Sequence, residues 1–137
     1  NKYTMHTNVT ETNTRNTDVR HGFIKSAGFA FHGIKQFFKS ERNGRMQAII
    51  AISVFLAGML FSITMIEWLI IILFTAIVIS MEMFNSALEK ICDKINPELD
   101  PQIKLIKDLA AGAVLWCAII SAVAGLIIFV PKIIELI

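Results

Sequence analysis

Cysteine and charge are both scarce in this sequence, and each shortage argues against a class of protein. The two cysteines, Cys92 and Cys117, form no CxxC pair and no metal-ligand spacing with histidine, which argues against a disulfide framework and a zinc site. Charged residues make up 18% of the chain and hydrophobic residues 55%, well outside the balance of an ordinary soluble domain. At 137 residues there is room for one domain and for no separate catalytic module.

The first 20 residues have almost no large apolar side chains. They are rich in Asn and Thr and cannot bury a core, so we expect residues 1–20 to form a disordered polar tail. They also lack the apolar run of a signal peptide. The remainder, residues 21–137, is predicted to be a single membrane domain.

Residues 21–42 are predicted to form an amphipathic surface helix. On a helical wheel two sets of side chains take opposite sides, namely Phe23, Ala27, Phe31, Ile34, Phe37 and Phe38 against Lys25, Gly28, His32, Lys35 and Lys39. A basic face opposite an aromatic face is typical of a helix that lies in the headgroup layer of an anionic membrane. The alternative is a helix packed on a soluble core.

Charge is absent over long stretches of the rest of the chain. Residues 46–66 contain none, and at about 1.5 Å per residue this segment can span a hydrocarbon core of about 30 Å. Residues 68–95 and 101–130 are the second and third predicted spans, the third beginning with Asp100 as N-cap and Pro101 as the first helical residue. The predicted fold class is therefore an all-α membrane protein, with one surface helix and three transmembrane helices per subunit.

The distribution of basic residues predicts the orientation. They gather before the first span and around the link between the second and third, as Lys25, Lys35, Lys39, Arg42, Arg45, Lys90, Lys94, Lys104 and Lys107. By the positive-inside rule these regions, and the amino terminus with them, are cytoplasmic. Both clusters then lie on the side where ATP is, and they follow the membrane boundary instead of forming a groove for nucleic acid.

Four polar residues of the second span share one narrow helix face. Taking Glu82 as the origin, Asn85, Glu89 and Asp93 lie at roughly 300°, 340° and 20° on a wheel of 100° per residue. Glu82 follows an uninterrupted apolar run and falls inside or at the edge of the bilayer, where an ionisable residue usually marks a functional path. Glu89 and Asp93 fall at or beyond the cytoplasmic headgroups. One row of side chains can therefore meet both a lipid hydroxyl and a soluble metal-nucleotide.

These parts suit phosphoryl transfer, which needs oxygen ligands for Mg²⁺, cations for the phosphates and a base for the attacking hydroxyl. Glu41 and Glu89 can supply the metal carboxylates, Lys104 and Lys107 the cations, and Glu82 the general base.

Other interpretations of the same residues stay open. Asn85 can serve only as a hydrogen-bond partner for a neighbouring helix, and Lys104 with Asp108 can be a solvated pair. A small proton-coupled transporter would also use Glu82, although it has no need of a cytoplasmic carboxylate row beside lysines. A structural membrane protein would leave Glu82 without a use.

The motifs resemble a known family. Glu82-Met-Phe-Asn85-Ser-Ala-Leu-Glu89, followed by Asp93 and then by Lys107-Asp108-Leu-Ala-Ala-Gly-Ala-Val114, is similar to the signature of the prokaryotic diacylglycerol kinase family, which includes undecaprenol kinase. The resemblance covers about residues 22–131. Glu41-Arg42-Asn43 and Ile66-Glu67-Trp68 look more like the undecaprenol kinase branch, which favours a polyprenol over diacylglycerol as the acceptor.

This resemblance implies a homotrimeric lipid kinase of the bacterial cytoplasmic membrane that uses ATP and Mg²⁺ and has active sites shared between subunits. By position, Glu82 would accept the proton and Asn85 would orient it, while Glu41 and Glu89 would hold the metal. The nucleotide contacts would come from Asp93, Glu98, Lys107 and Asp108. The enterobacterial-type enzyme has Tyr, His and Arg at or near Phe29, Asp100 and Gly22, so its contacts there are not carried over.

Overall fold

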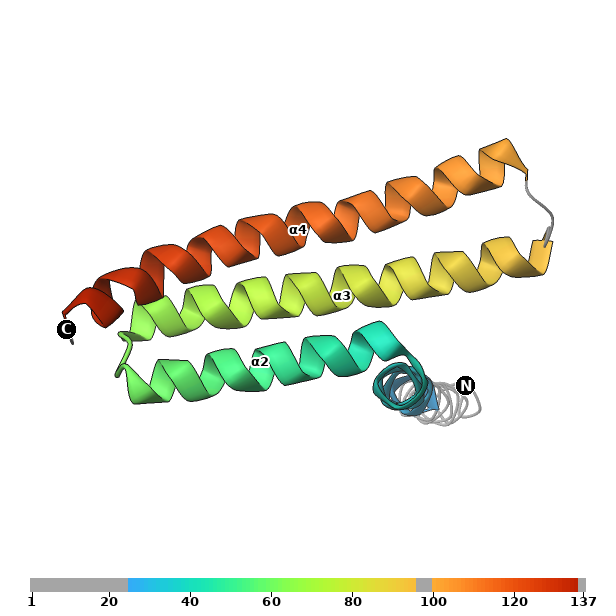
Figure 1. Cartoon of the computed structure of the whole chain (residues 1–137). Coiled ribbons are helices and arrows are strands. Elements are labelled where there is room, and N and C mark those ends of the chain that lie inside the picture. Colours follow the sequence, from blue (N-terminus) through green and yellow to red (C-terminus); the bar gives the residue numbers. More distant parts are fainter. Residues whose placement is uncertain (1–24, 96–99, 136–137) are drawn as a thin grey trace, which may run out of the picture. The chain divides into compact units, whose positions relative to one another are not determined.

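The computed structural model describes residues 25–95 and 100–135 of the chain. The chain divides into two units between Phe37 and Phe38, and the second unit contains three long helices. These are α2 (Arg42–Leu60), α3 (Met65–Ile95) and α4 (Pro101–Ile134) (Figure 1). All three are long and apolar enough to cross a membrane, and the described residues contain no strand. The predicted all-α fold class with three spans is confirmed, and the protein is a multi-pass membrane protein.

Ahead of α2, residues 25–40 are helical. Phe29 and Phe31 are more than 70% exposed on this segment, whereas Phe37 is buried. The helix stops at Glu41, which has an extended backbone conformation and is the N-cap of α2. The predicted surface helix began at residue 21, and residues 21–24 lie outside the described residues. That this helix lies on the membrane surface stays a prediction.

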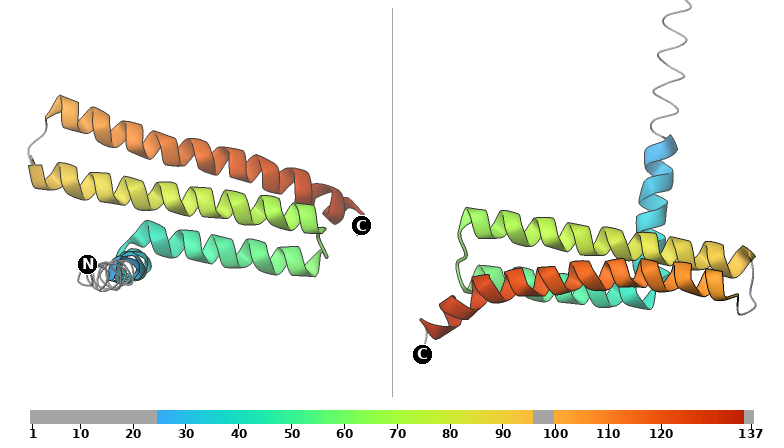
Figure 2. Two further views of the ribbon diagram at one scale, coloured as in Figure 1. Left: turned by 180° about the vertical axis from the view of Figure 1, so that it is seen from behind. Right: turned by 90° about the horizontal axis from the view of Figure 1, so that it is seen from above.

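Helix α3 packs against both other helices of its unit and runs antiparallel to each of them (Figures 1 and 2). A small core joins the three helices near the α2–α3 turn, where Ile63, Ile71 and Ile128 are buried together. Phe55 stacks on Trp68 in the same region, with ring centroids 5.5 Å apart. Many other large apolar side chains are exposed along the helices, as expected where the surroundings are lipid or other subunits rather than water.

The link between α2 and α3 differs from the prediction. The first span was expected over 46–66 and the second from 68, but α2 ends at Leu60 and α3 begins at Met65. Ser62 takes a left-handed conformation with φ of 49°. A capping box then starts α3, because the Glu67 carboxylate accepts from the Thr64 amide at 2.6 Å and the Thr64 hydroxyl accepts from the Glu67 amide at 3.4 Å. The turn has no charged residue and neither Gly nor Pro, so hydropathy did not define its exact bounds.

The start of α4 agrees with the predicted third span, and its end does not. Its start is as predicted, since Pro101 is the first residue and the Asp100 side chain accepts from the Gln102 amide at 2.7 Å. Its end differs, because the third span was expected to stop at Val130, whereas α4 continues to Ile134. Proline lacks one amide donor, and in the last turn of a long helix this costs a single backbone hydrogen bond.

Candidate functional site

The site is built around a carboxylate inside the bundle. Glu82 is only 4% exposed although it belongs to a membrane-spanning helix. Its Oε1 accepts a hydrogen bond of 2.5 Å from the Nδ2 of Asn43, which lies in the first turn of α2. This bond joins two helices across 39 positions of sequence. A buried carboxylate needs such a partner, and the bond fixes the position of one Glu82 oxygen.

One turn further along α3, Asn85 is also buried, with 5% of its surface exposed. Its Nδ2 donates to the Oε1 of Glu89 at 3.2 Å, so Asn85 holds the next carboxylate of the row. The Oδ1 of Asn85 is buried and has no hydrogen-bond partner within the described part of the chain. A buried acceptor left without a donor is costly, so this atom is available to accept from a group outside the described residues.

Glu41 contacts the same stretch of α3 from the N-cap of α2. Its Oε1 lies 2.6 Å from the Nζ of Lys90, the residue that follows Glu89. The hydrogen bond and charge of Lys90 lower the pKa of Glu41, and Ser40 and Arg45 add smaller effects in the same direction. Glu41 is therefore ionised at neutral pH and close to the turn of α3 that carries Glu89.

A second ion pair lies at the cytoplasmic-side end predicted for α3 and α4, where the Nζ of Lys107 is 2.9 Å from the Oδ1 of Asp93. At the opposite end of the same two helices, Lys132 pairs with Glu67 at 3.4 Å. The two pairs fix one antiparallel register along the whole of α3 and α4. Asp108 is exposed, and Glu98 lies outside the described residues.

The structure thus places the predicted residues in pairs rather than in one cluster. Asn85 pairs with Glu89, and Asp93 with Lys107. Two partners were missed by sequence reasoning: Asn43, the donor to Glu82, and Lys90, the partner of Glu41. Asn43 belonged to the Glu41-Arg42-Asn43 motif, which was the one signal that pointed to it.

Within residues 25–95 and 100–135, no group of three or more His, Cys, Asp or Glu side chains is placed to hold a metal ion. Magnesium is often bound by only one or two protein carboxylates, with substrate phosphates and water completing the shell. In the described residues the Glu41 carboxylate is bonded to Lys90 and the Glu89 carboxylate to Asn85, so the predicted pair of ligands does not form a protein cage.

Known proteins resemble this chain over most of its length. The chain is 41% identical over 110 residues to an undecaprenol kinase of Bacillus subtilis, a match that covers 80% of this chain and 89% of that protein. It is 29% identical over 119 residues to a diacylglycerol kinase of Synechocystis, covering 86% and 68% of the two chains. Residues 28–129 match the prokaryotic diacylglycerol kinase family as a whole. With that match extending from the first described helix to the last turns of α4, the chain belongs to the prokaryotic diacylglycerol kinase family.

Proposed function

We propose that this protein phosphorylates the hydroxyl group of a membrane lipid alcohol with ATP, and that undecaprenol is favoured over diacylglycerol. The observation that carries the proposal is the buried Glu82 carboxylate, held by Asn43 inside a membrane-spanning helix. The more similar of the two named relatives is the undecaprenol kinase. Diacylglycerol is the second candidate acceptor, supported by the family's own description and by the other relative.

In the proposed reaction Glu82 accepts the proton of the acceptor hydroxyl as its oxygen attacks the γ-phosphorus of ATP. The new O–P bond forms while the bond from that phosphorus to the β,γ-bridging oxygen breaks, and ADP leaves. The hydrogen bond from Asn43 fixes one Glu82 oxygen, and the hydrogen bond from Asn85 positions the Glu89 carboxylate one turn further along α3. A general base placed in this way contributes about 10²–10⁴-fold to the rate.

The charged residues toward the other end of α3 suit the nucleotide. We assign the divalent metal to Glu41 and Glu89, where, when bound, Mg²⁺ would neutralise charge developing on the phosphates. Asp93, Glu98, Lys107 and Asp108 are assigned to the nucleotide itself. Lys107 is half-exposed and Asp93 more so, which suits a soluble ligand.

The assembly and its placement in the membrane belong to the same proposal. A homotrimer in the bacterial cytoplasmic membrane, with a cytoplasmic amino terminus and active sites shared between subunits, brings the basic clusters to the side of ATP. The unpartnered Asn85 Oδ1 and the incomplete metal ligand set both favour a site that a neighbouring subunit and the substrates complete.

The direct test measures ATP- and Mg²⁺-dependent phosphorylation of undecaprenol and of diacylglycerol, side by side in mixed micelles. Glu82→Gln is the control variant, because it removes the base and keeps the side-chain size. Product mainly from undecaprenol supports the proposal, and product mainly from diacylglycerol replaces the favoured acceptor with the second candidate. No product from either lipid with a folded protein refutes the kinase proposal.

A further inference from the structure

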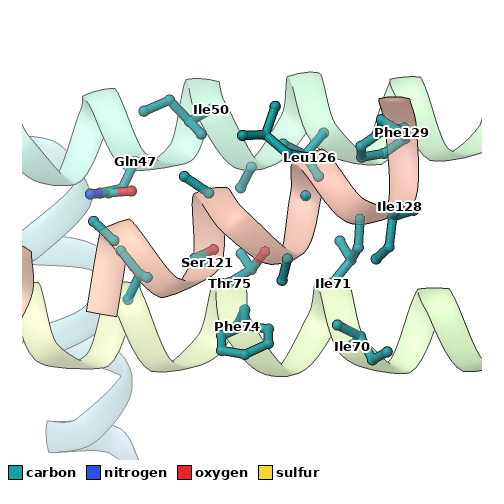
Figure 3. Close-up of a pocket in the computed structure, with 17 residues that line it drawn as sticks. Gln47, Ile50, Ile70, Ile71, Phe74, Thr75, Ser121, Leu126, Ile128 and Phe129 are labelled. Atoms are coloured by element: carbon teal, nitrogen blue, oxygen red, sulfur yellow. The ribbon is translucent and has the colours of Figure 1, made fainter. Parts of the chain in front are cut away.

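A cavity of about 530 Å³ lies among α2, α3 and α4, within the range of sites that bind organic ligands. Its walls are mostly aliphatic and aromatic, and its polar side chains are few, namely Gln47, Thr75 and Ser121. Figure 3 shows Gln47 at one end of the cavity and Phe129 with Ile128 at the other. Of the wall residues, Ile71, Val78 and Ile128 are buried, whereas Ile50 and Leu126 are exposed, so the cavity is partly open at the surface of the three-helix unit.

The cavity begins where the candidate catalytic pair ends. Gln47 lies one turn after Asn43 on α2, and Val78 lies one turn before Glu82 on α3. Because α2 and α3 are antiparallel, both wall residues lie on the same side of the Asn43–Glu82 hydrogen bond, toward the α2–α3 turn. On α4, the register set by the Lys107–Asp93 and Lys132–Glu67 pairs puts Glu82 level with Cys117. The first wall residue of α4 is Ala118, the next along the helix. All three helices therefore place one end of the cavity beside Glu82.

From that end the cavity runs toward the α2–α3 turn. Along α3 its wall extends from Val78 to Ile70, which is about 12 Å at the rise of an α-helix. By the same register Gly125 lies level with Phe74, about 12 Å from the level of Glu82. The space is thus an elongated apolar groove that leads away from a carboxylate and into the membrane-spanning part of the bundle.

We propose that this groove binds the hydrocarbon chain of the acceptor lipid, with the hydroxyl at Glu82 and the adjoining chain segment between α2 and α4. The proposal rests on the proposed lipid kinase function, and it specifies which part of the acceptor lipid the three-helix unit binds. An apolar chain is the occupant that fits a wall with so few polar groups and one end beside the proposed base Glu82. The groove is too short for a whole polyprenol, so the far end of the chain extends into the bilayer.

Gly125 offers a direct way to fill the groove. It belongs to the wall, and a Cβ built there meets no heavy atom of the described residues within 4 Å, so a leucine enters open space. Gly112 is the matched control, because it is also a glycine of α4 with open space at its Cβ, and it lies outside the groove. Both substitutions raise helix propensity equally, so a difference between the variants reports on the groove.

The test measures kcat/KM for undecaprenol and for geraniol, a prenol too short to reach the level of Gly125. Gly125→Leu is expected to lower kcat/KM for undecaprenol about tenfold or more, since several methylene groups lose their burial. Geraniol turnover is expected to be unchanged, and Gly112→Leu is expected to match the wild type with both alcohols. Equal losses with both alcohols, or an undecaprenol value for Gly125→Leu equal to that of Gly112→Leu, would overturn the proposal.

A binding measurement separates this proposal from the kinase function. Undecaprenol retained by the Glu82→Gln protein is measured by native mass spectrometry from detergent micelles, alone and combined with Gly125→Leu or Gly112→Leu. Loss of retained undecaprenol only with Gly125→Leu supports the groove, even if the wild type phosphorylates no alcohol and the proposed function fails. Equal retention of undecaprenol in all three Glu82→Gln proteins would show that the groove does not bind the acceptor chain. A changed oligomeric mass with Gly125→Leu alone would show that the groove is occupied by another subunit instead.

Discussion

At the scale of single residues, burial separates the members of the polar row on α3. Glu82 and Asn85 are at most 5% exposed, while the side chain of Asp93 is 66% exposed. A carboxylate enclosed within the bundle can meet a lipid hydroxyl, and an exposed one can meet a soluble nucleotide. This contrast favours the proposed division of the row into a part for the acceptor and a part for the metal-nucleotide.

This division predicts different defects for two isosteric variants. Glu82→Gln is expected to lower kcat by about 10²–10⁴-fold, because the general base is lost, with ATP affinity within about twofold of the wild type. Glu89→Gln is expected to weaken the affinity for Mg²⁺-ATP instead. Binding of a fluorescent ATP analogue, measured beside steady-state turnover, checks both. An equal loss of nucleotide affinity in the two variants would contradict the division.

Asn43 is predicted to be a positioning residue for Glu82. Asn43→Ala removes the donor of the 2.5 Å bond and leaves a buried carboxylate without its partner. We expect kcat to fall by about tenfold or more, with little change in the KM for ATP, since a hydrogen bond to a charged group is worth about 1.5–3 kcal/mol. A purely structural role would lower thermal stability and both kinetic constants together, so melting curves accompany the kinetics.

Lys90 is predicted to give the protein a pH-dependent increment of stability. The pKa of Glu41 is lowered in the folded protein, chiefly by Lys90, so the ion pair stabilises fully above the ordinary carboxyl pKa of 4.5 and is lost as the pH falls through the lowered value. Lys90→Ala is expected to cost about 0.2–1 kcal/mol at pH 7, because the pair is at the surface. The melting temperatures of the wild type and of Lys90→Ala should converge as the pH is lowered from 7 to 3. A difference in melting temperature that stays constant over this range would contradict the prediction.

Which contacts the sequence can predict depends on their range. The angular positions of Glu82, Asn85, Glu89 and Asp93 follow from helical geometry alone, and Asn85 and Glu89 are indeed joined one turn apart. The Asn43–Glu82 and Lys90–Glu41 contacts depend on how α2 packs on α3, across 39 and 49 positions. No periodicity carries that information, so the partners of Glu82 and Glu41 came only from the structure.

At the scale of elements, the apolar character of the three helices and the start of α4 at Asp100 and Pro101 were predictable, whereas the exact bounds of the α2–α3 turn were not. The α2–α3 turn is defined by the Thr64–Glu67 capping box and the left-handed Ser62, inside a continuous apolar run. Its tightness depends on Gly58, where a Cβ would lie 2.8 Å from the Cη2 of Trp68 and 3.0 Å from the Cδ1 of Ile63. Close approach of two membrane helices commonly needs such a small residue.

Gly58→Leu is therefore predicted to destabilise the α2–α3 pair. A leucine must displace the Trp68 ring, and overpacking of this kind costs about 1–3 kcal/mol, more than the gain of about 1 kcal/mol in helix propensity. Thermal unfolding in detergent, followed by circular dichroism, measures the change. Gly112→Leu, which adds the same side chain to open space within its chain, is the control and should not lower the melting temperature. A variant as stable as the control would show that the turn can relax around the added side chain.

At the scale of the whole molecule, one chain leaves the site incomplete in two ways. Among residues 25–95 and 100–135, the buried Asn85 Oδ1 has no donor and no set of three metal ligands is present. Large exposed apolar side chains run along all three helices, so each chain has surface available for other subunits as well as for lipid. These features favour the proposed trimer in which neighbouring subunits share each active site.

Shared sites make a prediction about mixtures of two inactive variants. Glu82→Gln and Asp108→Asn are each expected to be inactive alone, because one lacks the proposed base and the other a proposed nucleotide contact. If those side chains come from different subunits, each mixed cyclic trimer has one site of its three with both wild-type residues, so roughly a third of the activity returns. Co-expression with two affinity tags, followed by purification on both, isolates the mixed trimers for assay. Mixed trimers that form but recover nothing would place both side chains of a site in one chain, and the buried Asn85 oxygen would then require a partner from the substrate instead of from the neighbour.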